Sequence, residues 1–202
     1  MFFIYRILTN LTLVLSPIII LIRLLKKKED PVRYWEKFGF YSKKKLTGKL
    51  IWIHGASVGE ILSMVPLIEK LENNKKIKQI LVTSSTLSSS KILSTFKLKK
   101  TVHQFFPIDT HYHTQKFLNY WRPSVVIFVD SEIWPNMFKN IKKRKIWLML
   151  ANARITQKSF ERWKIFPKSA KKIFQSFDIC LSSSIRSSRY LRLLGANKIK
   201  LF

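Results

Sequence analysis

The sequence has few of the residues that crosslink a chain, coordinate metals or interrupt regular structure. Its 202 residues include one Cys, five Gly and seven Pro. A single Cys excludes an internal disulfide framework and a Cys-rich zinc module, and it is typical of a reducing compartment. An apolar fraction of 47% excludes a disordered polycation. Length and composition therefore predict one globular domain, or a little more, with a real core.

Acidic residues are also scarce. There are 11 Asp and Glu against 38 Lys and Arg, which leaves a formal net charge of +27. Such a surplus on a folded chain indicates an anionic partner: nucleic acid, an anionic membrane face or a phosphorylated substrate. Drift in composition would supply part of the excess, because Ile, Ser and Asn are abundant as well as Lys. No recognisable DNA- or RNA-binding motif is present, so nucleic acid is not the expected partner.

The chain begins with a long apolar segment. Residues 7–22 carry no charge, and the stretch 2–25 is interrupted only by Arg6 and Arg23. This length just spans a bilayer if both arginines snorkel, and an in-plane interfacial helix is the alternative. A cleaved signal peptide fits less well, because the run lacks a small-x-small site and ends in the basic cluster 26–28. The positive-inside bias then predicts that the rest of the chain is cytoplasmic.

From residue 50 onward, short apolar runs alternate with stretches of helical spacing. The expected strands are 50–54, 79–84, 102–106, 125–129, 146–150 and 178–181, and the expected helices are 61–71, 87–96, 111–121, 135–142, 159–176 and 185–194. Strands that are apolar throughout are typical of a parallel sheet covered on both faces. The pattern predicts a Rossmann-like α/β domain over 50–202, with ligands beyond the carboxyl ends of the strands. Residues 1–28 are expected to form the membrane anchor and basic flank, and 29–49 a juxtamembrane collar.

Acidic side chains follow the first and fourth expected strands, at the edge where ligands bind in this architecture. Glu60 lies in the first turn of a helix, where it is either an acid stabilised by the helix dipole or a general base. Ser57 and Gly59, in the same loop, let the backbone approach a ligand closely. After the fourth strand, Asp130 is expected to cap the turn or pair with a nearby base. Glu132 is the better site candidate, since it lies where ligands bind in this architecture.

Hydroxyl and guanidinium groups follow two further strands. Thr83 and Ser84 end the second strand ahead of a helix and are suited to sugar or phosphate contacts, and equally to capping. Arg154 follows the fifth strand, where it can bind a carboxylate or phosphate in bidentate fashion.

Neither a metal nor a catalytic triad is expected. His103, His111 and His113 lack an acidic or Cys partner at a familiar ligand spacing. Cys180, flanked by apolar residues, is expected to be a small buried side chain. No nucleophile elbow is present.

These motifs, in this order, resemble the N-terminal half of the 3-deoxy-D-manno-octulosonic acid (Kdo) transferase family. The strings that carry the resemblance are R-Y-W-E-K-F-G at 33–39, W-I-H-G-A-S-V-G-E at 52–60, S-E-I-W-P-N at 131–136 and A-N-A-R at 151–154, with shorter matches at 83–86, 106–109 and 194–196. Together with the apolar N-terminus they cover essentially the whole chain.

The resemblance implies the acceptor-side half of a GT-B glycosyltransferase of lipopolysaccharide core biosynthesis. Such an enzyme transfers Kdo from CMP-Kdo to a lipid A precursor at the cytoplasmic face of the inner membrane, without a metal or other cofactor. Glu60 is implied as the general base that deprotonates the acceptor hydroxyl, with inversion at the anomeric carbon. The implied substrate-binding residues are Ser57, Gly59, Thr83, Ser84, Glu132 and Arg154.

Two departures from the family pattern qualify this expectation. In the family a second GT-B domain supplies most contacts to CMP, and we expect that domain to be missing after residue 202. The stretch 182–186 reads Ser-Ser-Ser-Ile-Arg, where the family usually has Gln and an acid. We expect the chain to be incomplete alone, with a separate chain as the possible carrier of the second domain. The alternative is a non-catalytic, membrane-associated remnant that binds glycolipid.

Overall fold

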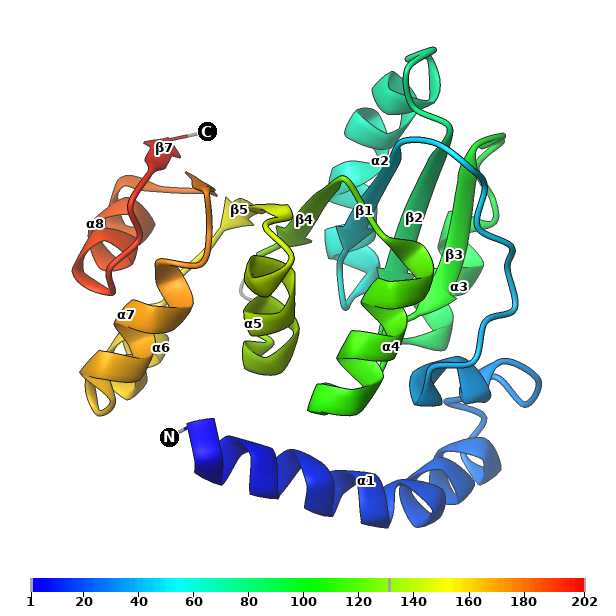
Figure 1. Ribbon diagram of the computed structural model, residues 1–202, viewed down its shortest axis with the longest axis horizontal. Coiled ribbons are helices and arrows are strands. Elements are labelled where there is room, and N and C mark those ends of the chain that lie inside the picture. Colours follow the sequence, from blue (N-terminus) through cyan, green and yellow to red (C-terminus); the bar gives the residue numbers. More distant parts are fainter. Residues whose placement is uncertain (1, 131, 202) are drawn as a thin grey trace.

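A computed structural model describes residues 2–130 and 132–201 (Figure 1). Its centre is a parallel sheet in the order β3-β2-β1-β4-β5-β6-β7. The strands are β1 (Leu50–His54), β2 (Gln79–Ser84), β3 (Thr101–Phe105), β4 (Val125–Val129), β5 (Trp147–Ala153), β6 (Ile179–Ser182) and β7 (Ile199–Leu201). The chain reverses its direction of winding between β1 and β4, so this is the switch point beside which a doubly wound sheet binds ligands. The Rossmann-like expectation is confirmed.

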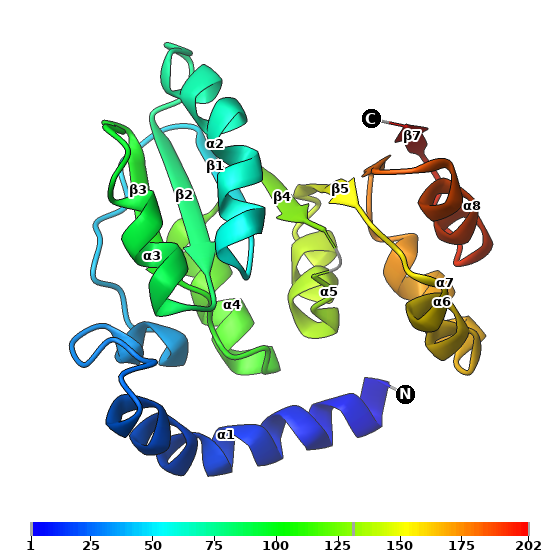
Figure 2. The same cartoon turned by 180° about the vertical axis from the view of Figure 1, so that it is seen from behind.

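Helices cover both faces of the sheet (Figures 1 and 2). The helices of the described chain are α1 (Phe2–Leu25), the 3-10 helix η1 (Tyr34–Phe38), α2 (Val58–Glu72), α3 (Leu87–Leu93), α4 (His111–Trp121), α5 (Pro135–Lys143), α6 (Gln157–Lys164), α7 (Pro167–Phe174) and α8 (Ile185–Leu193), of which α2–α8 flank the sheet. Thr110 and Ser184 are the N-caps of α4 and α8, and each accepts a hydrogen bond from the backbone N–H three residues later. Gly195 follows α8 with a φ of 101°, as expected of a residue that ends a helix.

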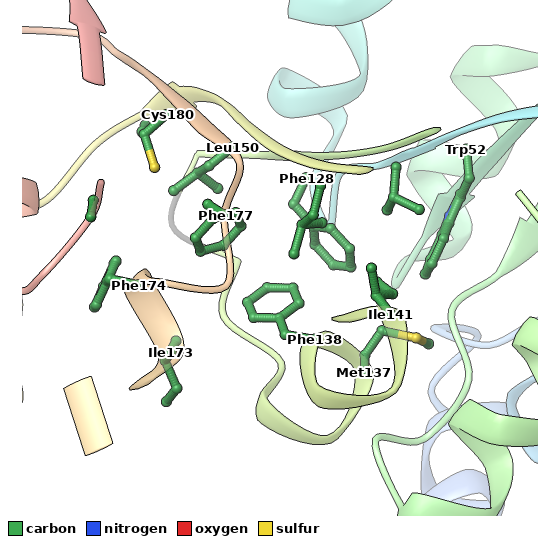
Figure 3. Close-up of a cluster of buried hydrophobic side chains, with 14 of the residues drawn as sticks. Trp52, Phe128, Met137, Phe138, Ile141, Leu150, Ile173, Phe174, Phe177 and Cys180 are labelled. Atoms are coloured by element: carbon green, nitrogen blue, oxygen red, sulfur yellow. The ribbon is translucent and has the colours of Figure 1, made fainter. Parts of the chain in front are cut away.

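Two apolar layers form the core, one on each face. Ile51 and Ile53 of β1 pack in the cluster under α2, whereas Trp52 belongs to the opposite cluster with Phe128 and Phe138. This second cluster is rich in aromatic rings and extends to the buried Cys180, as expected of that residue (Figure 3). Both faces of the central strands are therefore shielded from solvent, which explains why these strands are apolar throughout.

The expected single helix over 159–176 is wrong. The chain instead forms α6 and α7, which turn back on each other after Ile165 and Phe166. Pro167 is the first residue of α7. Proline has no backbone N–H and disfavours helical conformation in the residue before it, so it begins one helix and ends the other.

Helix α1 lies across the end of the domain where the central strands have their carboxyl ends (Figures 1 and 2). The Tyr5 hydroxyl donates to Asp109 Oδ2 at 2.6 Å, and Arg6 Nε donates to Asn136 Oδ1 at 3.4 Å. The helical segment 4–25 is long and apolar enough to cross a membrane. Only 11% of its apolar 18-residue stretch is buried against the rest of the protein. The domain therefore leaves most of this apolar helix uncovered.

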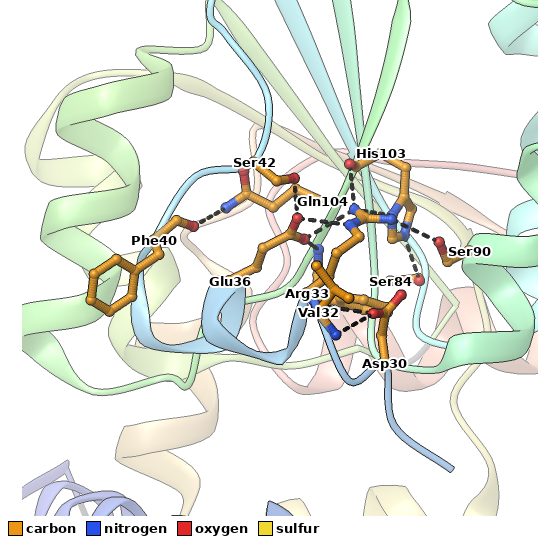
Figure 4. Close-up of polar contacts among 11 residues, drawn as sticks. Asp30, Val32, Arg33, Glu36, Phe40, Ser42, Ser84, Ser90, His103 and Gln104 are labelled. Atoms are coloured by element: carbon orange, nitrogen blue, oxygen red, sulfur yellow. Dashed lines mark hydrogen bonds and ion pairs between the residues drawn. The ribbon is translucent and has the colours of Figure 1, made fainter. Parts of the chain in front are cut away.

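The segment 29–49 wraps the outer strand β3 (Figure 4). Glu36 is buried and accepts the backbone N–H of Phe105 at 2.7 Å. Arg33 pairs with Glu36 and also donates to the carbonyl of His103 at 2.8 Å. These contacts cover a sheet edge that would otherwise expose unpaired backbone groups.

Candidate active site at the carboxyl edge of the sheet

The loop between β1 and α2 fixes the carboxylate of Glu60. Ser57 is the N-cap of α2 and accepts from the backbone N–H of Glu60 at 3.3 Å. The Ser57 hydroxyl donates to Glu60 Oε1 at 2.8 Å, and the backbone N–H of Ala56 donates to Oε2 at 2.8 Å. This reciprocal arrangement resembles a capping box. It holds the carboxylate at the helix start while leaving it partly open to solvent.

The two glycines of this loop serve different purposes. A Cβ on Gly55 would lie 3.0 Å from Glu60 Cβ and 3.2 Å from Ile61 Cδ1, so the absence of a side chain lets Glu60 pack against the loop. A Cβ on Gly59 would have no atom within 4 Å. Gly59 therefore faces open space beside the carboxylate, where a ligand has room to approach.

Three carboxylates gather at the switch point. Burial raises the pKa of Glu60, and the negative charges of Glu132 and Asp130 raise it further, while hydrogen bonds from Ser57 and Ala56 oppose the shift. Asp130 also has a raised pKa, chiefly because it is buried, although the positive charge of Arg154 opposes this. A carboxylate with a raised pKa is a stronger base, so the cluster favours proton transfer at Glu60.

Glu132 lies against two aromatic ring nitrogens, of which one donates a hydrogen bond to it. The indole Nε1 of Trp134 donates to Glu132 Oε2 at 2.8 Å. The fully buried His54 places Nε2 3.5 Å from the same oxygen. Burial works to raise the pKa of Glu132, but His54 and Trp134 outweigh it and hold the pKa below its usual range. Glu132 is thus kept ionised next to the more basic Glu60.

Thr83 and Ser84 lie behind this surface rather than on it. Thr83 is fully buried, and its hydroxyl accepts from Trp52 Nε1 at 2.8 Å and lies 2.9 Å from His54 Nδ1. Ser84 is also buried, with its hydroxyl 2.9 Å from His103 Nε2 (Figure 4). In this arrangement Thr83 orients the imidazole that supports Glu132.

Arg154 lines an open hollow of about 700 Å³ at the ends of β5 and β6. Arg186, Ser183 and Ser184 line the same hollow. Among the described residues, no carboxylate lies within ion-pair distance of either guanidinium. The hollow therefore presents two positive charges and several hydroxyls, a combination suited to a phosphate or carboxylate group.

A second hollow, of about 440 Å³, adjoins Glu132. Its walls include Trp134, Arg162, Trp163 and Phe166, from the loop after β4 and from α6 with the turn that follows it. Aromatic faces beside a carboxylate and a guanidinium provide both stacking surface and hydrogen-bonding groups.

The backbone leaves two adjacent strands through the left-handed region. Asp130, just after β4, has a φ of 58°, and Asn152, the next-to-last residue of β5, has a φ of 49°. Asp and Asn tolerate this region better than most residues, yet it still costs free energy. One oxygen of Asp130, Oδ1, is buried without a hydrogen-bond partner among the described residues.

The structure brings Glu60, Glu132 and Arg154 to one edge with Ser57 and Gly59, as the positions of the motifs predicted. Sequence reasoning missed the role of His54, did not foresee that Gly55 makes room for Glu60, and expected Asp130 to cap the turn or pair with a nearby base. His54 and Gly55 stand in the same string as Glu60, but their importance depends on contacts across the sheet and within the loop.

The strand order and the carboxylates at the switch point define a Rossmann-like α/β domain of the GT-B type. Solved structures agree with this fold. A putative UDP-N-acetylglucosamine 2-epimerase from Listeria monocytogenes superimposes with a TM-score of 0.55 at 13% identity, over 76% of this chain and 45% of that one. The UDP-GlcNAc 2-epimerase from Neisseria meningitidis gives 0.54 at 13% identity, with the same coverage of 76% and 45%.

The chain belongs to the 3-deoxy-D-manno-octulosonic acid transferase (Kdo transferase) family, whose family model matches residues 32–202. The 3-deoxy-D-manno-octulosonic acid transferase of Rickettsia bellii is 39% identical over 191 residues, which cover 95% of this chain and 46% of that protein. The Haemophilus influenzae enzyme of the same name is 28% identical over 198 residues, 96% of this chain and 46% of that protein. A probable mitochondrial transferase of Arabidopsis thaliana is 36% identical over 80% of this chain and 37% of its own length. The chain thus spans about half the length of these relatives.

Proposed function

We propose that this chain is the acceptor-side half of a Kdo transferase, with Glu60 as its general base. The observation that supports this most directly is the Glu60 carboxylate, fixed at a helix start by two hydrogen bonds and made more basic by burial and by two neighbouring acids. The proposed division is an anchor and basic flank at 1–28, a collar at 29–49 and an acceptor-binding domain at 50–202.

The proposed reaction moves Kdo from CMP-Kdo to a hydroxyl of a lipid A precursor. Glu60 takes the proton of the acceptor hydroxyl as its oxygen attacks the anomeric carbon of Kdo. The bond from that carbon to the CMP phosphate oxygen breaks, and its electron pair leaves with CMP. Attack opposite the leaving group inverts the anomeric configuration. Glu132 stays ionised and accepts hydrogen bonds from sugar hydroxyls in the adjoining aromatic hollow.

The arginine-lined hollow is the proposed site for an anionic group of the substrates. Arg154 and Arg186 offer planar donor pairs that match phosphate geometry, and the Ser183 and Ser184 side chains add hydroxyl groups. The acceptor is a phosphorylated glycolipid, so its phosphate is the proposed occupant.

The contacts to CMP are proposed to come from a second domain, either downstream or on a separate chain. We also propose that α1 attaches the protein to the cytoplasmic face of the inner membrane. The uncovered apolar surface of α1 and the basic residues 26–28 after it support this placement.

The test is a transfer assay with CMP-Kdo and a lipid A precursor, with and without the C-terminal half of the Rickettsia bellii transferase added in trans. Product is expected when both halves are present. Glu60→Gln is expected to lower the rate by 10²-fold or more, on the order expected for a lost general base, without weakening acceptor binding. Unchanged transfer by Glu60→Gln would exclude Glu60 as the base. Acceptor binding without transfer under any condition would favour the binding-only alternative.

A further inference from the structure

The tip of the α6–α7 hairpin, residues 164–168, exposes apolar side chains that the fold does not use. Ile165 is 69% exposed and Phe166 is 48% exposed. The hairpin is closed without them, because Phe166 N donates to the Trp163 carbonyl at 3.0 Å and Ala170 N donates to the Phe166 carbonyl at 2.9 Å. Trp163 packs on Phe174 with ring centroids 5.6 Å apart. Two large apolar groups are therefore presented to solvent by a rigid support.

Positive charges surround these apolar groups. The run 162–168 reads Arg-Trp-Lys-Ile-Phe-Pro-Lys, with three cations; Glu161 just before it pairs with Lys164 at 3.2 Å, which leaves Arg162 and Lys168 in excess. Arg162, Lys164 and Lys168 are all exposed. An apolar tip with a rim of Lys and Arg, next to a half-buried Trp, matches the interface of an anionic bilayer, where acyl chains lie beneath acidic headgroups.

The tip also lies at the same end of the molecule as α1. In both views the turn between α6 and α7 reaches toward the end along which α1 runs, and the loop after α2 lies at the opposite end (Figures 1 and 2). A surface that touches the apolar side of α1 is therefore also within reach of the tip.

We propose that the α6–α7 tip is a second membrane contact, in which Ile165 and Phe166 enter an anionic bilayer and Arg162, Lys164 and Lys168 bind its headgroups. This rests on the proposed attachment of α1 to a membrane. Two separated contacts fix the orientation of the domain on the membrane, whereas α1 alone would allow the domain to rotate about the helix axis. Phe166 and Arg162 also line the hollow beside Glu132, so a lipid headgroup at the tip is next to the proposed acceptor site.

Cys180 is fully buried, which permits a site-specific test with a thiol-reactive, environment-sensitive fluorophore. The label is placed at Ile165→Cys, at Val14→Cys on α1 and, as a control, at Lys75→Cys in the loop after α2. Each protein is mixed with vesicles of phosphatidylcholine, with or without phosphatidylglycerol. The labels at 165 and 14 are expected to shift to the blue and to be quenched by doxyl groups in the acyl chains, whereas the label at 75 stays unchanged.

The possible outcomes separate the two proposals. A shift at 14 without one at 165 overturns the tip contact and leaves the attachment of α1 intact. No shift at either position overturns the membrane placement itself. A shift at 165 that appears on raising the protein concentration without vesicles indicates a second copy of the chain and overturns the lipid assignment. Lys168→Gln removes one positive charge and is expected to weaken partitioning about fivefold on vesicles with phosphatidylglycerol and to have no effect on phosphatidylcholine alone. An equal effect on both kinds of vesicle would overturn the headgroup contact.

Discussion

At the scale of single residues, the two glycines of the β1–α2 loop provide a matched pair of variants. Gly55→Ala places a methyl group 3.0 Å from Glu60 Cβ, so the melting temperature is expected to fall and transfer to drop with it. Gly59→Ala meets no atom within 4 Å. It is expected to stabilise the fold by about 0.5–1 kcal/mol, because alanine is a better helix former.

Thermal unfolding and the two-component transfer assay distinguish these variants. Slower transfer in a stable Gly59→Ala protein would show that substrate occupies the space beside Gly59. A Gly55→Ala protein with unchanged stability and unchanged transfer would contradict the close packing of Glu60 on the loop.

The basicity of Glu60 is a second property of individual residues. Because burial raises its pKa, Glu60 is expected to titrate above the ordinary glutamate value of 4.5. Ser57→Ala removes a hydrogen bond to the carboxylate and should raise the pKa further. Glu132→Gln removes a nearby negative charge and should lower it. NMR titration of ¹³C-labelled glutamate carboxyls measures the pKa of Glu60 in both variants. A shift of that pKa in the same direction in both would refute this account.

At the scale of helices and strands, local pattern predicted most of the domain. The expected bounds of β1, β2, β4 and α4 match the structure, because short β-branched runs and strong caps define them. The interruption between α6 and α7 was missed, although Pro167 was visible, since apolar residues keep helical spacing across it. Periodicity reports which face is buried, and both helices of the hairpin bury their faces against the same core.

Helix α1 is joined to the domain by one strong hydrogen bond. The Tyr5 hydroxyl donates to the buried carboxylate of Asp109 at 2.6 Å. Burial raises the pKa of Asp109 to about 7, so above that pH Tyr5→Phe is expected to reduce the free energy of unfolding by about 1.5–3 kcal/mol, the range for a hydrogen bond to a charged group. Tyr112→Phe is the control, because Tyr112 is 67% exposed. Thermal unfolding in detergent micelles measures the stability of both variants. An equal loss of stability in the two would argue against a structural role for the Tyr5 hydrogen bond.

At the scale of the whole molecule, part of the charge of +27 lies where anionic groups are proposed to bind. The basic tip of α6–α7 lies toward the end along which α1 runs, and Arg154 and Arg186 line a hollow at the strand ends. The sequence predicted an anionic partner but not this distribution. The position of α1 across the sheet edge and the pairing of His54 with Glu132 depend on contacts between residues far apart in the chain, so no local pattern indicated them.

The contacts of Asp109 connect α1 to the candidate site. The same carboxylate that holds Tyr5 also accepts the backbone N–H groups of Asn136 and Met137 at 3.1 and 2.8 Å, and so caps α5. The loop that carries Glu132 leads directly into that helix. A shortened, more soluble protein that starts after α1 would therefore lose one of the supports of its own site. Ligand screens and crystals based on such a protein would describe a site without that support, whereas the full chain in lipid nanodiscs would retain it.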